Sequence, residues 1–165
     1  MRTLRALFDP ISVLKIIVAS AGAILLVAGA ALAGPVKNVE AHAIGQVVSR
    51  TVCSPTQFCQ EAHVSGTATV IGRFEGVLSD LVDFTDGTFT GTGVFTMPDG
   101  STITTEYTGV VGPPDANGVS SFIEFHHVVD GTGKYENASG DIQVTGTVDP
   151  ALRIEIVGVG TLNTK

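Results

Sequence analysis

Histidines and acidic residues are the side chains of this sequence that could do chemistry, and they gather in two places. His126 and His127 are adjacent, and Asp80, Asp83 and Asp86 follow one another at intervals of three. Imidazole serves as an acid, a base or a metal ligand, and carboxylate oxygens are the ligands that Ca²⁺ prefers. The sequence therefore offers two places where proton transfer or metal binding could be built.

The histidine pair lies in a segment with the alternation of a strand. Adjacent strand residues face opposite sides of a sheet, so His126 and His127 cannot chelate one metal from a regular strand. We expect His127 to face the core beside Phe125, where a histidine with one hydrogen bond is favoured over a ligand or an acid–base group. His42 and His63 lie on separate segments without the spacing of metal ligands. The sequence predicts no metal site.

The acidic run, Asp80 to Asp86, could hold Ca²⁺ in principle. It lacks the alternating Asp/Asn ligands and the closing Glu of a calcium loop, so a solvated turn is the favoured interpretation. No serine stands in Gly-x-Ser-x-Gly, the pattern of a nucleophile elbow. The Gly-Thr-Gly sequences at 91–93 and 131–133 do not open helices and are not nucleotide loops. We predict no catalytic residues and no cofactor.

The two cysteines, Cys53 and Cys59, are predicted to form a disulfide. An even number of cysteines in an exported chain is typical of a disulfide, and Pro55 lets the segment fold back on itself. The bond closes a short loop and would stabilise the fold by ~2 kcal/mol. The alternative is a redox or metal pair. Five residues separate the cysteines and no other Cys or His lies beside them, which favours the structural bridge.

The N-terminus has the pattern of a secretory signal peptide. Arg2, Arg5 and Lys15 precede an uncharged run at 16–33 that ends in Ala-Leu-Ala. We expect a signal helix in residues 1–33, cleavage after residue 33, and a secreted or periplasmic protein without stable membrane association. The alternative is an uncleaved anchor, because eighteen apolar residues can just span a bilayer.

Length and charge limit the classes of protein. The 165 residues suit one domain, and the net charge of −7 disfavours nucleic acid as a partner, since phosphate backbones repel an acidic surface. After residue 33 the chain is rich in Thr, Val and Gly, and no long helical periodicity is present. Period-2 alternation recurs instead, broken by turn signals such as Asp86-Gly87 and Pro98-Asp99-Gly100. The alternating segments are 62–78, 87–97, 101–111, 119–129, 141–148 and 151–161.

These segments predict an all-β fold, an antiparallel up-and-down β-barrel. Closely spaced strands pair as hairpins, and a closed barrel buries their apolar faces without leaving edges. Glycines inside the strands favour the barrel over a two-sheet sandwich, the alternative. The expected organisation is a signal peptide at 1–33, a lead-in with the disulfide loop at 34–59, and the barrel at 60–165.

Few polar side chains are expected on the inner face. The alternation places Thr105, Tyr107 and His127 there, and it places Glu124 outward. Small barrels are usually filled by their own side chains, although inward glycines leave some room. The weak ligand-contact candidates, beside which a small apolar molecule could bind, are Phe89, Tyr107, Phe125 and His127.

Several motifs resemble one family of barrels. Gly72-Arg-Phe, the Gly-Thr-Phe-Thr-Gly-Thr-Gly sequence at 87–93, the Gly-bounded loop at 131–140 and the closing Val159-Gly-Thr-Leu together cover about 90 residues. They resemble small secreted bacterial barrels like allene oxide cyclase, related to the calycin-like and dirigent barrels. The resemblance implies about eight antiparallel strands and a homo-oligomer. It does not carry the cyclase activity, which requires inward polar groups including a carboxylate, because no residue here matches that site.

The sequence thus gives a first hypothesis of a secreted, non-catalytic barrel with a structural or binding role. The alternative is a carrier of a small hydrophobic ligand inside the barrel. An isomerase like allene oxide cyclase ranks third, since the alternation finds no inward carboxylate.

Overall fold

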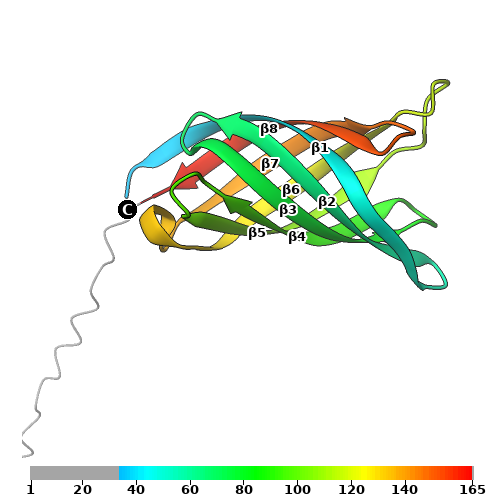
Figure 1. Ribbon diagram of the computed structural model, residues 1–165, viewed down its shortest axis with the longest axis horizontal. Coiled ribbons are helices and arrows are strands. Elements are labelled where there is room, and N and C mark those ends of the chain that lie inside the picture. The colour runs from blue at the N-terminus through cyan, green and yellow to red at the C-terminus, as the bar shows by residue number, and fades with distance from the viewer. Residues whose placement is uncertain (1–33, 165) are drawn as a thin grey trace, which may run out of the picture. The chain divides into compact units, whose positions relative to one another are not determined.

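The computed structural model describes residues 34–164, and these form eight β-strands and one short 3-10 helix (Figure 1). The predicted signal helix lies outside the described residues. No helix within the described part of the chain is long and apolar enough to cross a membrane. The strands are β1 (Val36–Ser54), β2 (Gln57–Ala68), β3 (Gly72–Asp83), β4 (Thr88–Thr96), β5 (Thr102–Val111), β6 (Ser120–Gly131), β7 (Ser139–Val148) and β8 (Arg153–Asn163), with η1 (Gly133–Tyr135) between β6 and β7.

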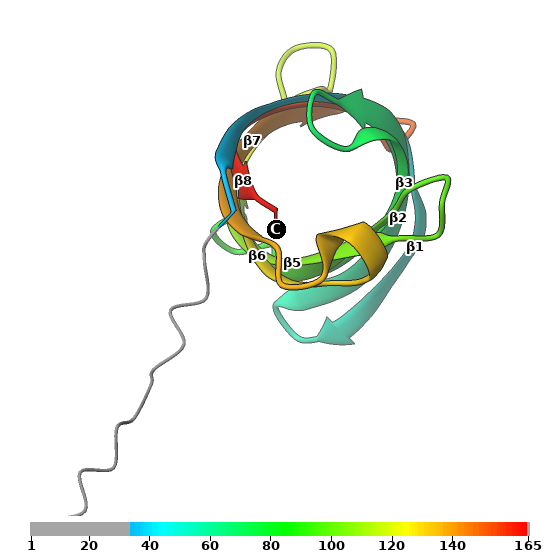
Figure 2. The same ribbon diagram turned by 90° about the vertical axis from the view of Figure 1, so that its left-hand side faces the viewer.

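The strands close into a single antiparallel barrel. Each strand pairs with the next along the chain, and β8 pairs with β1 from Val36↔Asn163 to Gln46↔Arg153. Figure 2 shows the strands as a ring around the barrel axis. The predicted up-and-down barrel is confirmed and the two-sheet sandwich is excluded. Closure satisfies the backbone hydrogen bonds of every strand edge, which an open sheet would leave unpaired.

Strand alternation separates a largely apolar interior from an outer face that mixes threonines and charged residues with exposed apolar side chains such as Val157 and Val159. The predicted inner faces of β4, β5, β7 and β8 are confirmed, for example by Phe89 and Ile103, which are buried, and by Thr90 and Glu106, which are exposed. The hydrophobic core therefore lies inside the barrel, and its side chains surround any site in the lumen.

Two segments differ from the sequence-based organisation. Residues 34–59, expected as a lead-in, contribute all of β1 and the start of β2 to the barrel. The single strand expected at 62–78 is two strands, because the chain turns at 69–71 and continues from Gly72 with a positive φ of 76°. Inward residues have even numbers on both sides of this turn, so alternation alone does not reveal it.

The orientation predicted for β6 is wrong. Glu124 and His126 face the interior and are 6% and 5% exposed, whereas Phe125 is 56% exposed on the outer face. His127 also faces outward, where its ring contacts the exposed carboxylate of Asp141. The alternation placed the more apolar set of β6 inside. The barrel buries the polar set instead because Glu124 and His126 satisfy each other's hydrogen-bonding groups.

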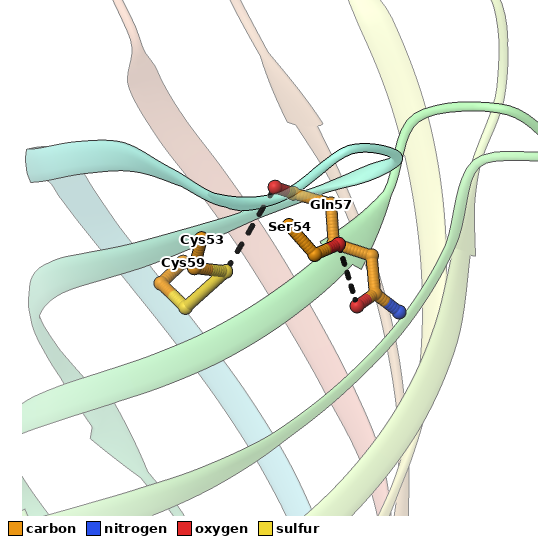
Figure 3. Close-up of a disulfide and its surroundings, with 4 residues drawn as sticks. All are labelled: Cys53, Ser54, Gln57 and Cys59. Carbon is orange, nitrogen blue, oxygen red and sulfur yellow. Dashed lines mark hydrogen bonds between the residues drawn. A yellow bond between two sulfur atoms is a disulfide. The ribbon is translucent and has the colours of Figure 1, made fainter.

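The predicted disulfide is present at the tip of the β1–β2 hairpin. Cys53 and Cys59 are bonded across the hairpin, close to its turn (Figure 3). Cys53 Sγ also lies 3.8 Å from the carbonyl oxygen of Gln57, and Ser54 Oγ donates a hydrogen bond of 3.1 Å to Gln57 Oε1. The bond ties together the end of β1 that carries Arg50.

Candidate functional site

A single cross-strand row of residues runs around the barrel interior from β1 to β6. In the strand register each member of the row is the direct partner of the next. Directly opposed residues on one face of a sheet are close enough for their side chains to touch. This set, called the polar row below, consists of Arg50, Gln60, Asp80, Gly91, Tyr107 and His126.

Gly91 is the position that lets the polar row connect. It lies between Asp80 and Tyr107 in the register, and a Cβ there would approach the Tyr107 ring and hydroxyl to 2.5 and 2.6 Å. Because no side chain stands at 91, the Tyr107 ring lies across this strand and its hydroxyl donates a hydrogen bond to Asp80 Oδ1. The Tyr107 ring also stacks on the ring of His126, and the two ring centroids lie 4.3 Å apart.

His126 is held by hydrogen bonds at both ring nitrogens. Nε2 lies 2.8 Å from Glu124 Oε2, and Nδ1 lies 2.9 Å from Thr105 Oγ1. The side chains of His126 and Glu124 are 5% and 8% exposed. With its proton on Nε2, the His126 ring donates a hydrogen bond to the Glu124 carboxylate. Its Nδ1 then accepts a hydrogen bond from the Thr105 hydroxyl. The interior thus contains a buried carboxylate–imidazole pair, an arrangement able to accept and return a proton.

The opposite end of the polar row reaches the barrel rim. Arg50 Nε and Nη2 donate to Gln60 Oε1 at 3.1 and 2.7 Å, and Gln60 Nε2 donates to Asp80 Oδ2 at 2.8 Å. The Arg50 guanidinium also lies 4.4 Å from the Phe58 ring centroid, a cation–π contact. A chain of hydrogen bonds therefore links the rim with Tyr107, whose ring stacks on the buried His126.

Burial dominates the electrostatics of the row. It raises the pKa of Asp80, and the hydrogen bonds from Tyr107 and Gln60 and the nearby His126 and Arg50 only partly oppose the rise. Burial, together with the Asp80 carboxylate, also raises the pKa of Tyr107, so this phenol stays protonated and donates. The pKa of Arg50 is lowered by partial burial, against the attraction of Asp80. Asp80 therefore gives up its proton less readily than an exposed aspartate does.

Replacing Asp80 with asparagine should change how stability depends on pH. Because the folded-state pKa of Asp80 is raised above 3.8, the stability that this carboxyl contributes is full below pH 3.8 and is lost as pH rises through the raised value. Asparagine cannot titrate, so the unfolding free energy of the wild type minus that of Asp80→Asn should fall with rising pH. One proton limits this slope to about 1.4 kcal/mol per pH unit. Urea unfolding of both proteins at a series of pH values from below 3.8 upward measures this difference in unfolding free energy. A difference that does not change with pH would contradict the raised pKa of Asp80.

The barrel interior contains two small chambers. One, the inner chamber, has a volume of about 80 Å³ and an almost entirely apolar wall, in which Thr105, Glu124 and His126 are the polar side chains. The other, the mouth chamber, also about 80 Å³, is lined by apolar residues and by four polar ones: Arg50, Gln60, Asp80 and Glu124. Three residues border both chambers and form a waist between them: Leu78, Glu124 and Ile156.

Half-buried residues border both chambers. In the inner chamber, Leu162 is 1% exposed but Ile71 is only half-buried. Around the mouth chamber, Phe58 and Phe122 are half-buried. Between the two chambers, Glu124 lies at the waist.

The predicted ligand-contact residues are divided by the barrel wall. Phe89 and Tyr107 face inward and pack edge to face, with centroids 6.4 Å apart, and Phe89 lines the mouth chamber. Phe125 and His127 lie on the outer face and do not reach the lumen, which corrects their expected inward position. Among residues 34–164, no group of three or more His, Cys, Asp or Glu could hold a metal ion.

Sequence reasoning missed most of the polar network. Arg50 and Gln60 fell in or beside the expected lead-in, and Asp80 was interpreted with Asp83 as part of a solvated turn. Asp83 does lie at the turn, where its carboxylate accepts hydrogen bonds from Thr85. Asp80 is even-numbered, like the inward residues that precede it on β3. Extending the alternation of 62–78 by two residues would therefore have placed Asp80 inside the barrel.

Comparison with models of protein families gives no match to this chain, and neither curated proteins nor solved structures give one.

Proposed function

We propose that this protein is an exported barrel that binds a small, largely apolar molecule in its lumen. The observation that carries the proposal is the apolar inner chamber with Glu124 and His126 in its wall. Ligand sites typically combine an apolar lining with a few converging polar groups. Export is supported by the Cys53–Cys59 disulfide and by the signal-like pattern at 1–33.

The size of the chambers sets the kind of ligand. An apolar cavity of roughly 150 Å³ holds one benzene molecule, and each chamber here is about 80 Å³. A molecule that stays in one chamber is therefore smaller than benzene, and one of five or more heavy atoms must pass the waist between Leu78 and Ile156 and occupy both chambers. The hypothesis of a carrier for a small hydrophobic ligand is thereby made specific: the two chambers are the binding place, and their volume limits the size of the ligand.

Binding of 2-methylbutane, a five-carbon apolar probe, tests this function. Addition of the probe should shift the methyl NMR signals of residues that line the inner chamber and raise the melting temperature, because a ligand that binds only the folded state stabilises it. Ala41→Leu should abolish the shifts, since Ala41 lines this chamber and the larger side chain fills it. The adjacent His42 faces outward, so His42→Leu is the matched control and should bind as the wild type does. An interior that shows no response to the probe would refute the proposal.

A proton-transfer isomerase is the second candidate. It is favoured by one observation, the buried Glu124–His126 pair in the chamber wall. Glu124 could accept a proton from one carbon of a bound molecule and return it to another, with no other reactant. The inward carboxylates Asp80 and Glu124 also supply the kind of group that an isomerase like allene oxide cyclase requires. Rearrangement of a bound unsaturated ketone, lost in Glu124→Gln, would favour this candidate over a pure carrier.

A further inference from the structure

We propose that Glu124 makes the lumen selective for apolar molecules that carry a hydroxyl group. This inference rests on the proposed binding function and specifies the chemistry of the ligand. Glu124 borders both chambers at the waist, so a molecule in either chamber, or one that passes between them, lies against this carboxylate.

One oxygen of Glu124 remains open to such a ligand. The hydrogen bonds among residues 34–164 engage Oε2, which contacts His126 Nε2 at 2.8 Å, and none of them engages Oε1. The side chain is nevertheless 8% exposed. Among the fully buried side-chain nitrogens and oxygens of these residues, the one without a partner is Asn163 Oδ1, so Glu124 Oε1 keeps some access to the space around it. Oε1 is therefore an acceptor in a largely apolar chamber wall that an incoming donor can reach.

The neighbouring donors are already engaged. Thr105 Oγ1 pairs with His126 Nδ1, and the Tyr107 hydroxyl donates to Asp80. Arg50 keeps N–H groups beyond the two that donate to Gln60, but it lines the mouth chamber and not the inner chamber. In the inner chamber, a ligand oxygen that can only accept thus meets no free donor, and it faces the lone pairs of Glu124. A hydroxyl group, which donates, fits the same position.

Three probes with the same five-atom skeleton test this selectivity: 2-methylbutane, 2-butanol and 2-butanone. The alcohol should bind the wild-type protein at least about tenfold more tightly than the ketone, since a hydrogen bond to a charged acceptor is among the stronger ones. In Glu124→Gln, His126 keeps the amide oxygen as its acceptor and the amide NH₂ turns to the chamber. This variant should lose the preference for the alcohol or reverse it. The matched control, Glu106→Gln, changes an exposed glutamate on the outer face of β5 and should leave the ratio unchanged.

The outcomes separate the two proposals. If 2-methylbutane binds and the wild-type protein does not prefer the alcohol, the hydroxyl selectivity is wrong and the binding function stands. A preference that Glu124→Gln retains, with its fold verified by NMR, also overturns the role of Glu124. If none of the three probes binds, the binding function itself is wrong.

Discussion

Replacing His126 with leucine should destabilise the barrel by about 3–5 kcal/mol, the usual cost of leaving a buried charge without its partner. The Glu124 carboxylate would remain in an apolar surrounding without the N–H group that now lies 2.8 Å away. The variant would also lose the hydrogen bond to Thr105 and the stacking on Tyr107. Urea unfolding followed by circular dichroism measures the change in unfolding free energy.

A double-mutant cycle separates the pair from these other contacts. Leucine at both 124 and 126 removes both polar groups, and replacing a buried pair by apolar residues is often neutral or stabilising. The double variant should therefore be clearly more stable than His126→Leu alone. His127→Leu is the matched control: His127 contacts Asp141 at the same 2.8 Å, but their side chains are 65% and 80% exposed. Its cost should stay below about 1 kcal/mol. Equal losses at 126 and 127 would contradict the orientation of β6.

This strand shows where sequence reasoning on the fold reaches its limit. Alternation orients a strand by comparing the polarity of its two faces, and it succeeds for β4, where Phe89 and Phe95 oppose a row of threonines. On β6 both faces are mixed. What decides the orientation is whether Glu124 finds a partner inside, and that partner, His126, is two residues away on the same face. The sequence shows two polar residues, and the structure shows that they are hydrogen-bonded to each other.

The polar row could not be predicted from the sequence, for a different reason. Its members come from six separate strands, and what joins them is the register, which places Gln60 opposite Asp80 and Tyr107 opposite His126. Register depends on turn positions, and the turn at 69–71 was not predicted. Tyr107 was identified because it is a polar residue on a clearly apolar face, whereas Arg50 and Gln60 resemble ordinary surface residues.

Glycines inside the strands were predicted to mark the barrel, and the structure shows that they act in different ways. Gly91 leaves room for the Tyr107 ring, and Gly109 similarly lies beneath the Phe89 ring. Gly160, on β8, is enclosed by backbone: a Cβ there would overlap the carbonyl oxygen of Asp141 and lie 2.6 Å from the Cα of Ile142. A side chain can rotate away from such a clash, whereas a neighbouring strand cannot move without disturbing its hydrogen bonds.

Gly160→Ala is therefore expected to destabilise the barrel by about 1–3 kcal/mol or more, the range found for overpacked interiors. Gly158→Ala, two residues earlier on β8, is the control. A Cβ at 158 would make ordinary contacts of 3.4 Å with Ile142 Cγ2 and 3.5 Å with Ala41 Cβ. This change should be neutral, or should stabilise by up to about 1 kcal/mol because alanine restricts the unfolded chain.

Urea unfolding of the two glycine variants tests the register of β7 and β8. The clash at 160 exists only if these strands are paired with Ile142 opposite Gly160. A shift of that register by one residue would turn position 160 to the outer face. Similar stabilities for the two variants would then be expected, and that result would contradict the strand register that defines the lumen and its two chambers.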